Sequence, residues 1–168
     1  MSINVTQKGI LYYGAFQDST TQTIASTTTA YPVKLNTTDF SNGVSVVTDG
    51  TNLTRVTVAN AGIYNIQFSL QLANASTISV GDVDVWLRVN ETDIPASNSQ
   101  VSIVASHGGV SGKLIIALNY ILQFTAGQYF QLMWRGSLTD VTMPTIASQT
   151  SPTRPSTPSA IVTVTAVS

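Results

Sequence analysis

The sequence predicts an all-β protein built from two packed antiparallel sheets. Apolar and polar residues alternate with a period of two in several segments, and these segments are rich in Val, Ile, Thr and Tyr, which suit a pleated strand. Turn residues separate the segments, and no window has the capped i, i+3, i+4, i+7 apolar spacing of an amphipathic helix. About ten short strands with frequent turns indicate a sandwich or jelly roll.

The clearest half-buried strand covers residues 61–73. Its apolar row is Tyr64, Ile66, Phe68, Leu70 and Leu72, and the residues between them are Asn, Gln or Ser. Residues 82–90 alternate in the same way. We expect further strands at residues 10–16, 31–35, 44–48, 53–58, 100–106, 113–125, 129–134, 141–146 and 160–167. Asp49-Gly50 predicts a hairpin turn, and the three prolines of residues 151–159 predict a stiff loop before the last strand.

Two of these segments, residues 113–125 and 129–134, are apolar on both faces. Their second rows contain Ile115, Ala117 and Ile121 in the first segment, and Phe130, Leu132 and Trp134 in the second. A strand that is buried on both sides needs one layer above it and one below. The sequence offers no helix for the second layer, so we expect another copy of the same molecule to supply it.

The composition excludes several classes of function. Charged residues make up only 9% of the chain, against roughly 25% in an average soluble domain. A net charge of −1 argues against nucleic acid and anionic membranes as partners. The longest apolar run, residues 114–122, is too short to span a bilayer, and residues 1–9 have no apolar signal-peptide core, which argues against Sec-type export. Without cysteine there are no disulfides and no thiolate metal sites.

Residues 60–72 carry a family resemblance. Gly62, Tyr64, Ile66 and Phe68 follow the pattern Gly-x-Tyr-x-Phe-x-Phe/Tyr, with Ile66 in place of one aromatic residue. This resembles the central strand of the jelly roll shared by tumour necrosis factor (TNF) and the globular heads of complement. Three later pieces look like the version found in bacteriophage structural proteins: residues 83–90 with 94–98, residues 126–134, and residues 149–155 with 158–164. The resemblance covers residues 11–167.

The resemblance implies a ten-strand TNF-like jelly roll that assembles as a homotrimer. The length of the chain predicts a single domain, at residues 10–168, preceded by an N-terminal arm at residues 1–9, and we expect no cofactor. In such trimers a neighbouring subunit covers the inner sheet. The expected interface residues are Ile115, Ala117, Asn119, Ile121, Phe130 and Trp134, and the core strand signature is Gly62, Tyr64, Ile66 and Phe68.

Few residues suggest catalysis or metal binding. His107, the only histidine, lies in a Gly-rich turn without a Gly-x-Ser-x-Gly elbow, so we interpret it as a solvated side chain. Asp82 and Asp84 share a strand face and could hold a hard cation, but two carboxylates without a third more often form a solvated row that pairs with Arg88. Trp86 lies on the same polar row. It is either a sugar-stacking platform or, as we favour, a packing residue.

These observations favour a non-enzymatic structural protein. We expect a bacteriophage virion protein, namely a trimer that decorates the outer surface of the capsid, binds the major capsid protein and stabilises the shell. The sequence contains no collagen-like or coiled-coil stalk, which favours this role over a fibre. The alternative is a tail-fibre or knob protein whose loops contact the host surface.

Overall fold

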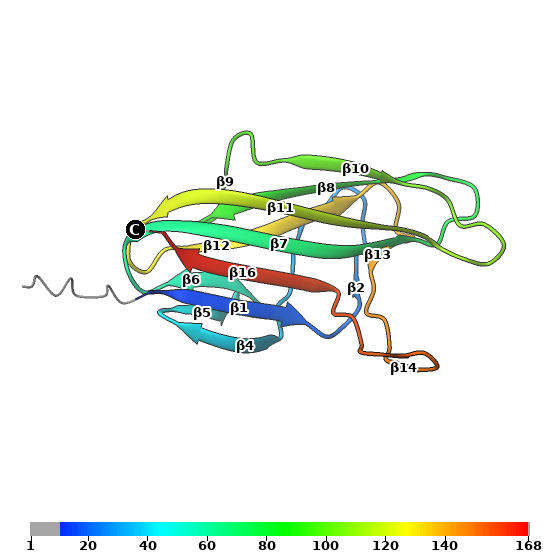
Figure 1. The fold of residues 1–168 in the computed structure, drawn as a ribbon. Coiled ribbons are helices and arrows are strands. Elements are labelled where there is room, and N and C mark those ends of the chain that lie inside the picture. Colours follow the sequence, from blue (N-terminus) through cyan, green and yellow to red (C-terminus); the bar gives the residue numbers. More distant parts are fainter. Residues whose placement is uncertain (1–10, 168) are drawn as a thin grey trace, which may run out of the picture.

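The computed structural model describes residues 11–167, and the predicted N-terminal arm at residues 1–9 lies outside this part (Figure 1). The prediction of an all-β protein is confirmed, since every regular element of the described part is a strand. The strands are β1 (Tyr13–Asp18), β2 (Gln22–Thr23), β3 (Tyr31–Pro32), β4 (Thr37–Asn42), β5 (Val44–Thr48), β6 (Leu53–Val58), β7 (Gly62–Asn74), β8 (Gly81–Val89), β9 (Thr92–Asp93), β10 (Ser99–Ile103), β11 (Gly112–Phe124), β12 (Tyr129–Gly136), β13 (Val141–Met143), β14 (Gln149–Thr150), β15 (Thr153–Arg154) and β16 (Ala160–Ala166).

Within residues 11–167, two seven-stranded sheets form the sandwich. Sheet A has the order β2-β13-β7-β16-β1-β4, with β11 paired to the other side of β7, and sheet B has the order β10-β8-β12-β6-β5, with β3 beside β12 and β9 beside β8. Every pair between these strands is antiparallel. The strands β14 and β15 make a separate small hairpin.

The longest pairing joins β7 and β11, which run side by side from Gly62 opposite Phe124 to Asn74 opposite Gly112. Among the described residues β11 has no strand on its other side, so it forms an edge of sheet A. A long edge strand presents unpaired backbone N–H and C=O groups, which proteins usually cover or protect. The edge position of β11 therefore makes this strand a candidate for contact with another subunit.

The core lies between the sheets and contains the inward rows that the sequence predicted. Tyr64, Ile66 and Phe68 of the strand signature are buried, and Gly62 begins the strand. The Tyr64 hydroxyl donates to the Asn60 carbonyl at 2.9 Å, which satisfies the polar end of a buried ring. The inward rows of β8, β12 and β16 pack against this one: Val83, Val85, Leu87, Phe130, Leu132, Trp134, Ala160, Val162 and Val164.

The predicted elements largely match the observed ones. The strands β5 and β6 have the predicted bounds, and β7, β8 and β11 are each shifted by one residue at both ends relative to the prediction. β4 was not predicted, because Thr37–Asn42 is polar except for Phe40 and forms a strand by pairing with β1. The number of strands also differs from ten, because short segments such as β2, β3 and β9 extend the two sheets.

The sandwich has two distinct ends (Figure 1). The first described residues and the end of β16 meet at one of them, where the Ala166 amide donates to the Tyr12 carbonyl at 2.8 Å. The opposite end, here called the distal end, carries the loops at residues 75–80 and 104–111 and the β14–β15 hairpin. The Ser106 amide donates a hydrogen bond to the Ser76 carbonyl at 2.7 Å, which joins the two loops. Nowhere in residues 11–167 is there a helix long and apolar enough to cross a membrane.

Candidate functional site

The outer face of sheet A is almost free of charge. We call it the A face, and it comprises the side chains of β11, β7, β16, β1 and β4 that point away from the core. The cross-strand neighbours of β7 on this face are amides, hydroxyls and aliphatic groups: Asn119 opposite Gln67, Thr163 also opposite Gln67, and Ile121 opposite Asn65. Lys113 lies at one end of β11 and Asp39 lies on the edge strand β4. The centre of the A face therefore presents no ionic group.

Large apolar side chains are exposed on the A face. Ile115 and Ile121 of β11 are 60% and 64% exposed, and Ala117 and Asn119 between them are also exposed. The other exposed large apolar residues on this face are Ile63, Ile161 and Phe40. An apolar, charge-poor surface beside a free strand edge is typical of a subunit interface. Four of the six residues that the sequence predicted for an interface thus lie together on the A face.

The prediction was wrong for the other two interface residues, Phe130 and Trp134. Phe130 and Trp134 are 0% and 1% exposed, because they point into the core between the sheets. The opposite row of β12 is also covered within the protomer: Gln131 and Met133 are both buried on the outer side of sheet B. Gln131 donates to the Thr54 hydroxyl at 2.8 Å, and Met133 lies between Trp86 and Pro32 in the strand register. The second cover of β12 therefore comes from its own chain.

A shallow groove of about 410 Å³ runs along the centre of the A face. Small side chains from adjacent strands, Ser69 and Ala117, form part of its lining. Other polar and apolar residues of the lining are Gln67, Asn119, Ile161 and Thr163. Asn65 lies one row further along, and its Oδ1 atom is enclosed without a hydrogen-bond donor among the described residues. The A face thus offers a depression, apolar ridges and an unused acceptor.

The outer face of sheet B has the opposite character. We call it the B face, and it holds three ion pairs: Arg55–Glu91 at 2.8 Å, Arg88–Asp93 at 2.7 Å and Arg135–Asp84 at 3.4 Å. Their side chains are partly or largely exposed, so each pair contributes little to stability. The two faces therefore differ sharply, with charge on one and almost none on the other.

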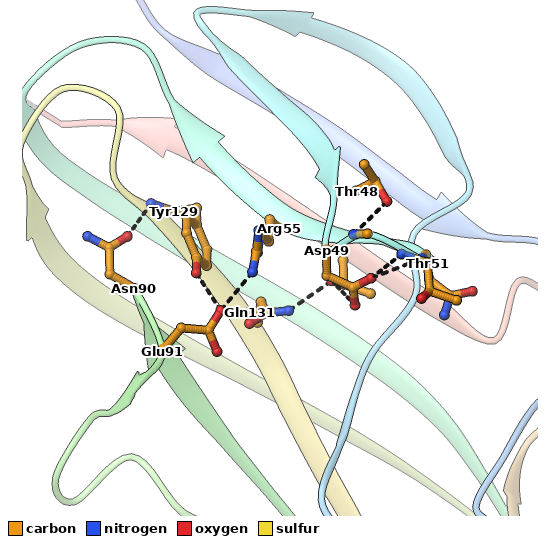
Figure 2. Close-up of polar contacts among 11 residues, drawn as sticks. Thr48, Asp49, Thr51, Arg55, Asn90, Glu91, Tyr129 and Gln131 are labelled. Atoms are coloured by element: carbon orange, nitrogen blue, oxygen red, sulfur yellow. Dashed lines mark hydrogen bonds and ion pairs between the residues drawn. The ribbon is translucent and has the colours of Figure 1, made fainter.

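Figure 2 shows the polar network in which Arg55 and Tyr129 both point toward Glu91. The Tyr129 hydroxyl donates to Glu91 Oε1 at 2.6 Å, and the Arg55 guanidinium lies 4.7 Å from the centre of the Tyr129 ring. The hydrogen bonds from Tyr129 and Arg55 hold the pKa of Glu91 below its usual value. The same bond to Glu91 raises the pKa of Tyr129. The network joins β6, β12 and the turn after β8.

A second cluster in Figure 2 shapes the turn between β5 and β6. Asp49 Oδ1 accepts hydrogen bonds from the Thr51 and Asn52 amides, both at 2.9 Å, and Asp49 Oδ2 accepts one from the Thr54 hydroxyl at 3.0 Å. Burial acts to raise the pKa of Asp49, but these hydrogen bonds outweigh it and keep the pKa below its usual value. Asp49 is therefore a structural turn residue.

The remaining candidates from the sequence have no catalytic or metal-binding partners among residues 11–167. His107 is exposed in a turn that it closes with Val110. Asp82 accepts a hydrogen bond from Ser102, and Asp84 accepts hydrogen bonds from Asn98 and Gln100. Arg88 forms its ion pair with Asp93 and not with Asp82 or Asp84. The described residues contain no group of three or more His, Cys, Asp or Glu side chains that could hold a metal ion.

Sequence reasoning missed the residues that organise the B face, namely Arg55, Glu91, Asp93 and Tyr129. They come from segments that are far apart along the chain, and only the fold brings them together. One signal was present in the sequence. In a chain with 9% charged residues, arginines at Arg55 and Arg88 interrupt strand segments, and such charges need partners.

Comparisons with known proteins bear on the fold alone. No protein-family model matches the sequence, and no curated protein matches it. Among solved structures, the crystal structure of murine APRIL at pH 8.5 superposes with a TM-score of 0.54 and 7% sequence identity, covering 94% of this chain and 100% of that one. APRIL is a TNF-family jelly roll. The chain is accordingly an all-β sandwich with the TNF-like fold.

Proposed function

We propose that the chain is a homotrimeric virion protein of a bacteriophage that decorates the outside of the capsid. In this proposal the A face of each protomer packs against its neighbours around a three-fold axis. The B face and the sandwich ends remain free for the major capsid protein and for solvent. The protein has no catalytic role, no cofactor, and no nucleic-acid or membrane partner.

One observation carries the proposal. The A face combines exposed Ile115 and Ile121, an uncharged centre and the free edge of β11, while the charged residues gather on the B face. Burial of such a surface in water is favourable, and ionic groups are depleted from the centre of interfaces. A second copy fits best because the A face itself supplies complementary elements: apolar ridges, a groove and hydrogen-bonding amides.

The symmetry of a trimer supports the proposed role in capsid decoration. A closed trimer matches the three-fold positions of an icosahedral shell. A protein that binds the assembled shell and not its separate subunits stabilises the shell by mass action. The resemblance of residues 83–90, 126–134 and 149–155 to bacteriophage structural proteins supports this setting.

Quantitative mass spectrometry of purified particles tests the role. Isotope-labelled peptides of this chain and of the major capsid protein would give their molar ratio in virions. We expect a ratio that corresponds to trimers on many three-fold positions. A ratio of only a few copies per particle would contradict decoration and favour a position at the tail.

The second candidate is a tail-fibre or knob protein that contacts the host surface. The distal end favours it, because four aliphatic residues are exposed on the two linked loops there. Ile78 is 89% exposed, and Val80, Val104 and Val110 accompany it. Binding of purified, labelled protein to host cells, with loss of binding in Ile78→Ser, would support this role. Equal binding to cells that the phage does not infect would count against it.

A further inference from the structure

A second groove, of about 380 Å³, lies on the B face beside Trp86, and we call it the Trp86 groove. It is separate from the A face and from the Arg55–Glu91–Tyr129 network. Its walls include an aromatic ring, a carboxylate, an amide and a guanidinium: Trp86, Asp84, Asn98 and Arg135. Asp93, Ile94 and Ala96 complete the lining. The proposed capsid role assigns nothing to this combination.

The indole of Trp86 is held in one orientation. Its Nε1–H donates to Asp93 Oδ1 at 2.8 Å, and Asp93 is itself fixed by Arg88, whose Nε–H donates to the same oxygen at 2.7 Å. Because the polar N–H of the ring is already engaged, the part of Trp86 that lines the groove offers ring carbons. A fixed aromatic surface binds a flat apolar partner at little cost in conformational entropy.

The polar wall opposite is held as firmly. Asp84 Oδ1 accepts from Asn98 Nδ2 and from Gln100 Nε2, both at 3.1 Å, and Asp84 Oδ2 lies 3.4 Å from Arg135 Nη1. The Arg135 Nε–H donates to the Thr27 carbonyl at 2.9 Å. A guanidinium has five donor hydrogens and an amide oxygen is an acceptor, so Arg135 and Asn98 retain capacity for a ligand.

Charge restricts the ligand class. Each carboxylate at the groove is matched by a guanidinium, Asp84 by Arg135 and Asp93 by Arg88, so the site is close to neutral. A charged ligand would have to compete with one of these pairs.

The groove also contains Ala96, whose φ of +61° is unusual for a residue other than glycine. Strained backbone of this kind is more frequent at ligand-binding sites.

We propose that the Trp86 groove binds a neutral pyranose sugar. The apolar face of the sugar ring stacks on the Trp86 indole, and its hydroxyls exchange hydrogen bonds with Asp84, Asn98 and Arg135. The site belongs to a single protomer, so the inference depends neither on the trimer nor on the capsid role.

Tryptophan fluorescence gives a direct test, because the chain has two tryptophans and Trp134 is 1% exposed in the core. The protein is titrated with lactose, maltotriose and tri-N-acetylchitotriose, and with tri-galacturonic acid as the charged comparison. We expect a saturable change in emission with at least one neutral sugar, and an affinity for the charged one that is lower by about tenfold. No saturable change with any neutral sugar, or tighter binding of the charged one, would overturn the proposal.

Two variants locate the site. Asn98→Ala removes an exposed side chain, leaves both tryptophans in place, and is expected to weaken binding by about fivefold or more, since a hydrogen bond contributes about 1 kcal/mol. Trp86→Ala is expected to abolish binding in saturation-transfer NMR, and Tyr129→Phe outside the groove is expected to leave it unchanged. Unaltered binding by Asn98→Ala would place the sugar elsewhere, as would unaltered binding by folded Trp86→Ala.

Discussion

Replacement of Ile121 by Asp is the most direct perturbation of the A face. Ile121 is 64% exposed in the protomer and lies in the outward row of β11 between Asn119 and Gln123. The protomer can place a carboxylate at this position in water without loss of core packing. We therefore expect Ile121→Asp to fold normally and to fail in association.

The magnitude follows from two terms. Burial of a whole isoleucine side chain contributes about 1.5–3 kcal/mol, and the exposed two-thirds of Ile121 would thus contribute roughly 1–2 kcal/mol per subunit in an interface. An unpaired charge enclosed in an interface costs about 3–5 kcal/mol more. Lys113, the cation on β11, is eight residues away, or roughly 26 Å along the strand, which is beyond the screening length of about 8 Å. The two terms sum to roughly 4–7 kcal/mol per subunit, which would weaken the association of the subunits by about a thousandfold or more.

The assay is light scattering coupled to size-exclusion chromatography at equal protein concentrations, with circular dichroism to verify folding. Ile78→Asp is the matched control, because it makes the same substitution at an exposed isoleucine on the distal end, away from the A face. We expect the control to keep the mass of the wild type and Ile121→Asp to elute as a folded monomer. If Ile121→Asp retains the trimer mass and an unchanged melting temperature, the A face is not the interface.

Three further predictions concern the protomer. Glu91 has a lowered pKa in the folded state, so its contribution to stability is present above the unfolded pKa of about 4.5 and is lost as the pH falls through the folded pKa. The melting temperature of Glu91→Gln should therefore depend less on pH below 4.5 than that of the wild type, and an equal pH dependence of the two would contradict this. A Cβ atom at Gly112 would meet the carbonyl oxygen of Val104, so urea unfolding of Gly112→Ala should show a loss of about 1–3 kcal/mol that Ser111→Ala does not show. Trypsin should spare the folded sandwich, because Arg55, Arg88, Lys113 and Arg135 lie within strands, and cleavage there as fast as in heat-unfolded protein would contradict this.

The sequence predicted the face of a strand on which a side chain lies wherever the alternation of apolar and polar residues alone determines it. In β11 one row is apolar throughout and the other is apolar at only three of its six positions, so Ile115 and Ile121 were correctly predicted to lie on a second face. In β12 both rows are apolar, and alternation does not reveal which part of the chain covers each row. Phe130 and Trp134 were therefore wrongly assigned to an interface, although they point into the core.

Other features depend on long-range pairing that no local pattern records. β4 is a polar segment whose strand conformation comes from its register with β1. The Glu91 carboxylate meets Arg55 and Tyr129, residues 36 and 38 positions away in the chain. Likewise, the Trp86 groove needs Asn98 and Arg135 from neighbouring strands or loops. From the sequence, packing was the favoured interpretation of Trp86 and sugar stacking the alternative, and no local pattern identified the partners of this residue.

Sedimentation equilibrium of the wild-type protein at micromolar concentration tests the central claim most directly. The claim is that sister subunits cover the A face. It predicts a single species of about 53 kDa, three times the 17.8 kDa of the chain, that persists on dilution. A stable species of 17.8 kDa over the same range would contradict it.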